Sequence, residues 1–220
     1  MTIALEIWAV AGAIALAGAV VGLARGLGKK RREAYEAYCL TRGYTFERER
    51  PRAERRYEDV FDLFRAGRSK KWGYTITGKR NGFPFTAFEY RWVTGSGNSS
   101  SHHRMHAIVW EAAEPSLPKF ALTPEGVLAR LGELFGMQDI DFPESPEFSR
   151  AYRLKGKDEA AIRDLFTSET RAFFAATPDQ KVAGGGHALF WWHAGRLPKP
   201  EQLDEYLEEG DRLRRRLFKE

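Results

Sequence analysis

The 220-residue sequence has one cysteine, Cys39, so it cannot form an internal disulfide bond. A domain without disulfides fits a reducing compartment, although many exported bacterial domains also lack cysteine. The sequence also lacks the GxxxxGK[ST] pattern of phosphate-binding loops and any convergent set of nucleophile, base and phosphate cradle. These absences leave enzymatic activity open but favour a non-catalytic role, and we expect no cofactor.

Charged residues are absent from residues 7–24, which read IWAVAGAIALAGAVVGLA. A helix from Ile3 to Leu27, with Glu6 near one end, is long enough to cross a hydrocarbon core of roughly 30 Å. The sequence therefore predicts a single transmembrane helix over residues 1–28. The alternatives fit less well, because a buried core helix of this length should have a polar face and a signal peptide should carry positive charge before its apolar stretch.

Excess positive charge is absent from most of the chain. Residues 72–220 carry 20 Lys and Arg against 21 Asp and Glu, whereas residues 25–71 carry 15 against 8. A nucleic-acid-binding domain should carry a basic face, so nucleic acid is not an expected partner. Basic side chains next to a bilayer instead attract anionic headgroups. We assign this membrane-surface role to Arg25, Lys29, Lys30, Arg31 and Arg32.

The same basic cluster predicts the orientation of the chain, because cytoplasmic flanks carry the excess of Lys and Arg. We expect a single-pass protein of the bacterial inner (cytoplasmic) membrane, with its N-terminus outside and its C-terminal domain in the cytoplasm. Gly18, Gly22 and Gly26 recur on one face of the predicted span. They either allow a homodimer through close helix packing or reflect the general frequency of glycine in such helices.

Beyond the span, residues 29–56 are predicted to form a basic juxtamembrane helix and a charged linker, and residues 57–220 a cytosolic α+β domain. Side chains alternate in polarity from Trp72, and Asn81-Gly82 is typical of a type I′ hairpin turn. We therefore expect a three-stranded β-meander that ends with a strand near residues 103–111. The fold class is α+β, with a mostly antiparallel sheet, this meander and packed helices.

The rest of the domain should alternate between short strands and helices. The segment over residues 187–193 has two apolar faces, so it should be a central or covered strand. The remaining predictions are a strand over 120–122, a helix after an N-cap at Thr123, an extended segment over 149–154, helices capped by Asp158 and Thr167, a strand over 181–183 and a closing helix over 200–218.

His102, His103 and His106 form an HHxxH cluster that is a weak candidate for a metal site. On a strand, the first and last of these would lie about 13 Å apart, too far to bind one ion, whereas on a helix they would meet. The sequence favours a strand, so we expect no metal and no assigned catalytic residue.

Three other features carry less chemistry. The loop at residues 95–101, GSGNSSS, and Gly184 to Gly186 are each either a phosphate cradle or a turn, and a turn is favoured. Cys39 is a weak candidate for acylation near a membrane. Carboxylates that could serve in acid-base or cation chemistry gather in an acidic stretch formed by Gln138, Asp139, Asp141, Glu144 and Glu147.

The chain resembles a widespread, uncharacterised family of bacterial N-terminally membrane-anchored proteins that has no assigned activity. The resemblance covers nearly the whole chain. It is carried by FDLFRAGRSKKWGYTITGKRNGFPFTAFEYRW, LPKFALTPEG, DIDFPESPEFSRAYRLKGKDEAAIRDLF and LFWWHAG. It implies a bacterial source and one folded unit, and it carries no functional residue across.

Two functions remain as expectations. In the first, the cytosolic domain is a binding or scaffolding module at the membrane surface, with an anionic bilayer and an unidentified protein as partners. In the second, the protein is an enzyme acting on a lipid or another membrane-proximal substrate. That enzyme would use His102, His103 and His106 with carboxylates near Asp139.

Overall fold

A single antiparallel sheet of nine strands organises the computed structural model, which describes residues 25–49, 53–114, 117–126 and 137–218. The strand order is β1-β2-β3-β4-β9-β8-β5-β7-β6, and every neighbouring pair is antiparallel. The strands are β1 (Thr45–Glu47), β2 (Arg68–Arg80), β3 (Phe83–Thr94), β4 (Ser101–Glu111), β5 (Leu117–Pro124), β6 (Gln138–Asp139), β7 (Tyr152–Gly156), β8 (Val182–Gly186) and β9 (Ala188–Ala194).

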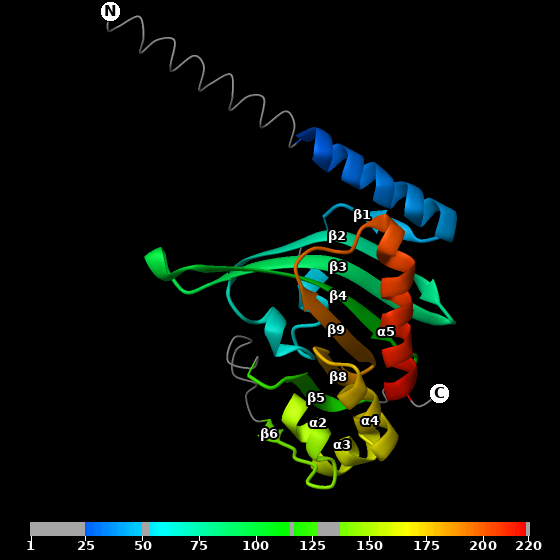
Figure 1. The fold of residues 1–220 in the computed structure, drawn as a ribbon. Helices are drawn as coiled ribbons and strands as arrows, with labels where there is room; N and C mark the ends of the chain where they lie inside the picture. The colour runs from blue at the N-terminus through cyan, green and yellow to red at the C-terminus, as the bar shows by residue number, and fades with distance from the viewer. Residues whose placement is uncertain (1–24, 50–52, 115–116, 127–136, 219–220) are drawn as a thin grey trace, which may run out of the picture.

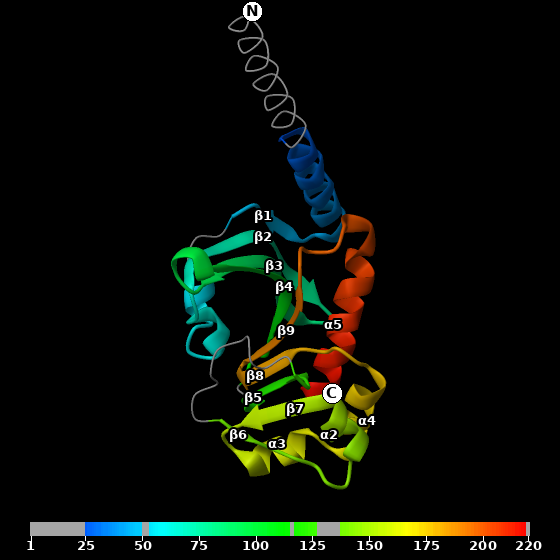
Figure 2. The same ribbon diagram turned by 60° about the vertical axis from the view of Figure 1, so that its left-hand side comes forward.

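Helices cover one face of this curved sheet, and the segment over residues 57–64 packs on the other (Figures 1 and 2). The first helix of the described chain, here called the basic helix, runs over residues 25–42 and crosses the sheet near β1. The other helices are α2 (Pro146–Ala151), α3 (Glu159–Leu165), α4 (Ser168–Ala176) and α5 (Leu203–Leu217). The 3-10 segments are η1 (Ala53–Arg56), η2 (Asp62–Phe64), η3 (Gly97–Ser99) and η5 (Pro200–Gln202).

The sheet has a hydrophobic core on each side. The helix face packs against the basic helix and α2 to α5, and its centre includes Ile108, Trp110 and Trp191. The aromatic face packs against the segment around η2, and it includes Trp72 and Phe190. Strand β9 contributes to both cores because its residues alternate between the two faces. Its position in the middle of the sheet confirms the prediction of a central strand with two apolar sides.

The structure confirms the α+β class, the antiparallel sheet and the β-meander, which is β2-β3-β4. Asn81 and Gly82 join its first two strands with φ values of 51° and 84°, as a type I′ turn requires. Asp158 and Thr167 cap α3 and α4 as predicted, each accepting a hydrogen bond from the backbone N–H three residues later.

The prediction of a transmembrane helix is wrong for the residues that the structure describes. In the ranges listed above, no helix is long and apolar enough to cross a membrane. The predicted span falls almost entirely on residues 1–24, which lie outside the described residues, as do Gly18 and Gly22. The basic helix that follows is amphipathic, since Tyr35, Tyr38 and Cys39 are buried against the sheet while most of its charged side chains are exposed.

One further local prediction is wrong, and another is wrong in part. Thr123 does not cap a helix, because it is a buried residue of β5 paired with Arg153 of β7. The prediction of an extended segment over residues 149–154 is wrong in its first half, which ends α2, and is confirmed in its second half, which begins β7. The predicted helix over residues 127–136 lies outside the described residues.

Candidate functional site

The three predicted histidines lie on strand β4, and the strand directs them to different surroundings. His103 turns to the aromatic face, where its ring stacks on Trp92 with centroids 4.9 Å apart, and it hydrogen-bonds Thr94. His106 is buried on the helix face, whereas His102 is exposed near the β3–β4 turn. Within the described ranges, no group of three His, Cys, Asp or Glu side chains is arranged to hold a metal ion.

The structure instead pairs His106 with His193 of β9, a partner that sequence reasoning missed. The two residues are opposite each other in the β4–β9 ladder, and their rings stack with centroids 5.5 Å apart. The pKa of each imidazole is lowered to about 4, mainly by burial, with smaller contributions from Lys181 at both rings and from the neighbouring His193 at His106. These neutral rings pack against Tyr206 of α5 and Trp191, so their surroundings are those of a core.

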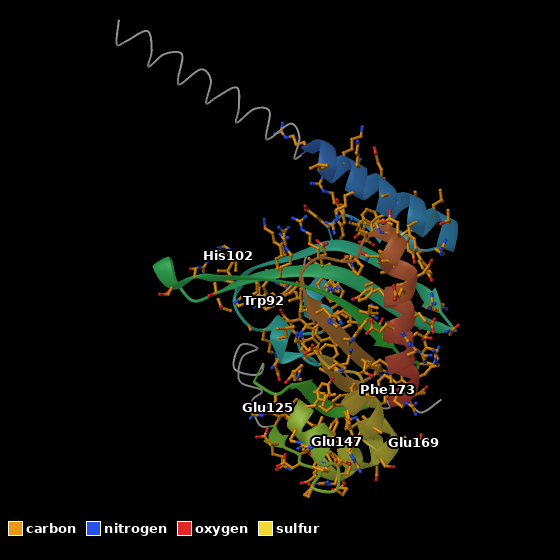
Figure 3. The ribbon with its side chains drawn as sticks, viewed as in Figure 1. Trp92, His102, Glu125, Glu147, Glu169 and Phe173 are labelled. Atoms are coloured by element: carbon orange, nitrogen blue, oxygen red, sulfur yellow. The ribbon has the colours of Figure 1, made fainter. Side chains whose placement is uncertain are left out.

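The acidic stretch lies far from these histidines. Asp139 belongs to β6, the edge strand five places from β4 in the sheet, and forms an ion pair with Lys155 at 3.6 Å. Glu144 pairs with Arg171 at 3.3 Å. Figure 3 shows His102 and Glu147 at separate ends of the described structure. The fold therefore does not bring the carboxylates near Asp139 to the histidine cluster.

The remaining weak candidates also have structural roles. Residues 97–99 form η3 in the turn between β3 and β4, and Gly184 to Gly186 end strand β8. Cys39 is only 2% exposed, and burial raises the pKa of its thiol to about 11. A buried thiol with a raised pKa is a poor nucleophile, which disfavours its acylation.

The predicted membrane-surface residues all lie on the basic helix, and they divide into two groups. Arg25, Lys29 and Lys30 are exposed, while Arg32 is half-buried and pairs with Glu36 one turn away. Arg31 is turned towards the sheet. Gly26, from the predicted helix-packing set, has no described atom within 4 Å of where a Cβ would lie.

Arg31 forms the contact that fixes the start of the basic helix to the sheet. Its guanidinium donates to the carboxylate of Glu89 on β3 and lies over the ring of Tyr74, 4.7 Å from the centroid. Glu89 also accepts from the backbone N–H of Leu197 at 3.1 Å. Burial lowers the pKa of Arg31, but the hydrogen bond and charge of Glu89 together with the contact to Tyr35 raise it by more, so the pKa is raised overall.

Beside this contact, the register of the sheet places cations in a row across three strands. Lys71 of β2 is opposite Arg91 of β3, and Arg91 is opposite Arg104 of β4. Arg196 lies two residues after the end of β9 and beside the same end of β4, because the intervening Gly195 donates its N–H to the carbonyl of Arg104. Residues opposite each other in an antiparallel pair point to the same face, so these side chains gather on one side of the sheet.

The row borders a cavity of about 480 Å³ that we call the arginine pocket. It lies between the start of the basic helix, β2, β3, β4 and the segment after β9, in the region where nitrogen atoms gather beneath the helix in Figure 3. It is lined by Leu27, Gly28, Arg31, Arg48, Glu49, Gly73, Tyr74, Glu89, Arg91, Arg104 and Arg196.

The pocket has an excess of positive charge, since five arginines line it against two glutamates. Burial lowers the pKa of Arg104, and repulsion from Arg196, Arg91 and Arg31 lowers it further, while Glu89 opposes this change. The sequence indicated one of these residues, because Arg31 was among the cations assigned to the membrane surface. The convergence of the other arginines depends on strand register, which the sequence did not provide.

The comparisons with known proteins concern the fold. No protein-family model and no curated protein matches the sequence. One solved structure is similar, the crystal structure of the mycobacterial trehalose monomycolate transport factor A, TtfA. The identity is 14% and the TM-score 0.60, over 89% of this chain and 94% of that chain. At this identity the likeness shows that the two proteins share a fold over nearly their whole lengths.

Proposed function

We propose that this protein is a non-catalytic binding module that acts at an anionic membrane surface, as an accessory factor in lipid transport. One observation carries the proposal: cations from the basic helix and from three strands of the sheet gather at the same end of the molecule. Each Lys or Arg near an anionic bilayer contributes on the order of 1 kcal/mol to binding. This end of the molecule is therefore suited to contact anionic headgroups.

The shared fold supports the transport part of the proposal. TtfA is, by its name, a transport factor for trehalose monomycolate, which is a glycolipid. The similarity covers 89% of this chain and 94% of that chain, so the two proteins share most of the fold on which the arginine pocket is built. The enzymatic alternative has no comparable support, because the fold separates the histidines from the acidic stretch.

The membrane part is tested by sedimenting the full chain with vesicles of phosphatidylcholine, with and without phosphatidylglycerol. Binding should require the anionic lipid and weaken as salt rises, because salt screens exposed charges. Replacing Arg25, Lys29 and Lys30 together by Gln should weaken binding by about tenfold or more. A matched triple replacement of exposed cations at the other end of the fold, Lys157, Arg212 and Arg216, should have little effect.

Equal losses in the two triple variants would contradict a membrane-facing end. The accessory role is tested separately by affinity purification of the full chain from native membranes after mild crosslinking. An accessory factor should be recovered with defined protein partners. Recovery of the bare protein, together with turnover of a lipid in an activity screen, would support an enzyme instead.

A further inference from the structure

We propose that the arginine pocket is a binding site for a single phosphate group, carried by an anionic lipid headgroup or by a free phosphate ester. The lipid source rests on the proposed membrane function, whereas the phosphate site itself does not. The site differs from the exposed cations of the basic helix because its arginines converge from separate elements on one cavity.

The charge balance of the pocket leaves room for an anion. Glu89 is occupied by Arg31 and by the N–H of Leu197. Among the described residues, no carboxylate forms an ion pair with Arg91, Arg104 or Arg196. An anion bound among these three would supply the negative charge that the sheet does not.

The cross-strand geometry favours phosphate over a single halide ion. Arg91 and Arg104 are directly opposite each other, and like charges in such pairs are destabilising. Each guanidinium is a planar fork of N–H donors that matches two phosphate oxygens at once. One phosphate between the two arginines would satisfy both forks and remove their repulsion. Burial lowers the pKa of Arg104, and repulsion from Arg196 and Arg91 lowers it further.

The shape of the pocket is suited to a headgroup. Gly73 of β2 lies beside Glu89, and a Cβ at Gly73 would come within 3.3 Å of the Cβ of Glu89. The glycine therefore keeps this wall of the cavity open. The volume of the arginine pocket, about 480 Å³, falls in the range of small-molecule sites. Leu27 is 60% exposed and lines the same cavity, so an apolar group attached to the phosphate has a surface to contact.

The experiment measures the binding of three probes to the full chain at constant ionic strength. These are inorganic phosphate, glycerol 3-phosphate and vesicles that contain phosphatidylglycerol. The variants are Arg104→Gln, the conservative Arg104→Lys, and Arg212→Gln as a matched control on the exposed side of α5. Removing one charge-assisted bidentate contact should weaken glycerol 3-phosphate binding by about tenfold or more. Arg104→Lys should lose less affinity for glycerol 3-phosphate than Arg104→Gln does, and Arg212→Gln should bind it as the wild type does.

The outcomes separate the two sources and the two proposals. If Arg104→Gln weakens glycerol 3-phosphate and vesicle binding together, the ligand is a lipid headgroup. If only the small phosphates are affected, the ligand is a free phosphate ester. If small phosphates bind but vesicles do not, the phosphate site stands and the membrane function fails. If no small phosphate binds and Arg104→Gln behaves like Arg212→Gln on vesicles, the phosphate site is overturned while the membrane function stands.

Discussion

Arg31 and Glu89 are 58 residues apart in the chain, and their ion pair joins the basic helix to the middle of the meander. Only 10% of the Glu89 side chain and 28% of the Arg31 side chain is exposed. Because Glu89 also accepts from Leu197, the pair connects the basic helix, β3 and the segment before α5. The contact therefore determines where the cations of the basic helix lie relative to the arginine pocket.

Arg31→Gln should destabilise the protein by about 2 to 4 kcal/mol, because it leaves the mostly buried carboxylate of Glu89 without its cation. Urea unfolding of the full chain, followed by circular dichroism, measures the change. The matched control is Lys29→Gln, which removes an exposed pair with Glu33 and should cost less than about 0.5 kcal/mol. Similar effects of the two variants would show that Arg31 and Glu89 do not hold the helix to the sheet.

Asp211→Asn should destabilise the protein strongly. Asp211 and Arg214 are fully buried, and Asp211 accepts from Arg214 and from Asn81 of the β2–β3 turn, each at 2.7 Å. An amide at this position would leave the positive charge of the buried Arg214 without an opposite charge. In comparable buried pairs, losing one partner lowers the free energy of unfolding by about 3 to 5 kcal/mol. Glu169→Gln, which removes an exposed pair with Arg216, is the control and should change the urea midpoint little.

The closing helix also shows what the sequence could and could not predict. Its existence and its apolar positions followed from helical spacing, and the same spacing places Arg214 four residues after Gly210 and three before Leu217 on the buried side. In the sequence, the basic residues of its last turns all look alike as favourable partners of the helix dipole. Only the contacts with the sheet show that one of them is buried over the ring of Phe83.

The meander was predictable because its signals are local, namely a period of two and an Asn-Gly turn. Strand β1 was missed because it has only three residues, and its pairing with Thr75 to Thr77 depends on contacts made 30 residues later. The arginine pocket was missed for the same reason. Arg91 and Arg104 meet only because the β3–β4 register places them opposite each other, and spacing along either strand alone does not show this.

Gly210→Ala should destabilise the protein by about 1 to 2 kcal/mol, although alanine is the better helix former by nearly 1 kcal/mol. A Cβ at this position of α5 would lie 2.9 Å from Ile108 and 3.1 Å from Trp191, both fully buried in the sheet. Gly28→Ala is the matched control on the basic helix, because nothing described lies within 4 Å of its Cβ position. The control should be neutral or stabilising in thermal unfolding. Stabilisation by both substitutions would show that α5 does not pack so closely on the sheet.

The buried pair of His106 and His193 should make the protein less stable as pH falls from about 6.5 towards 4. Both folded-state pKa values are about 4, below the ordinary value of 6.5, so the unfolded chain binds protons in this range before the folded chain does. Above pH 6.5 both states are neutral at these positions, and the effect disappears. Lys181 opposes protonation of both rings, and Asp179 favours it at His193.

Each histidine should contribute on the order of 1 to 2 kcal/mol of lost stability between about pH 7.5 and pH 5. The measurement is the free energy of urea unfolding across this range for the wild type and for His106→Gln with His193→Gln. The double variant starts less stable, so the slope with pH is the quantity compared, and it should be shallower. The control is His102→Gln, at an exposed histidine of the same strand, and it should keep the wild-type slope. Identical slopes in the wild type and the double variant would mean that these rings are not held neutral by burial.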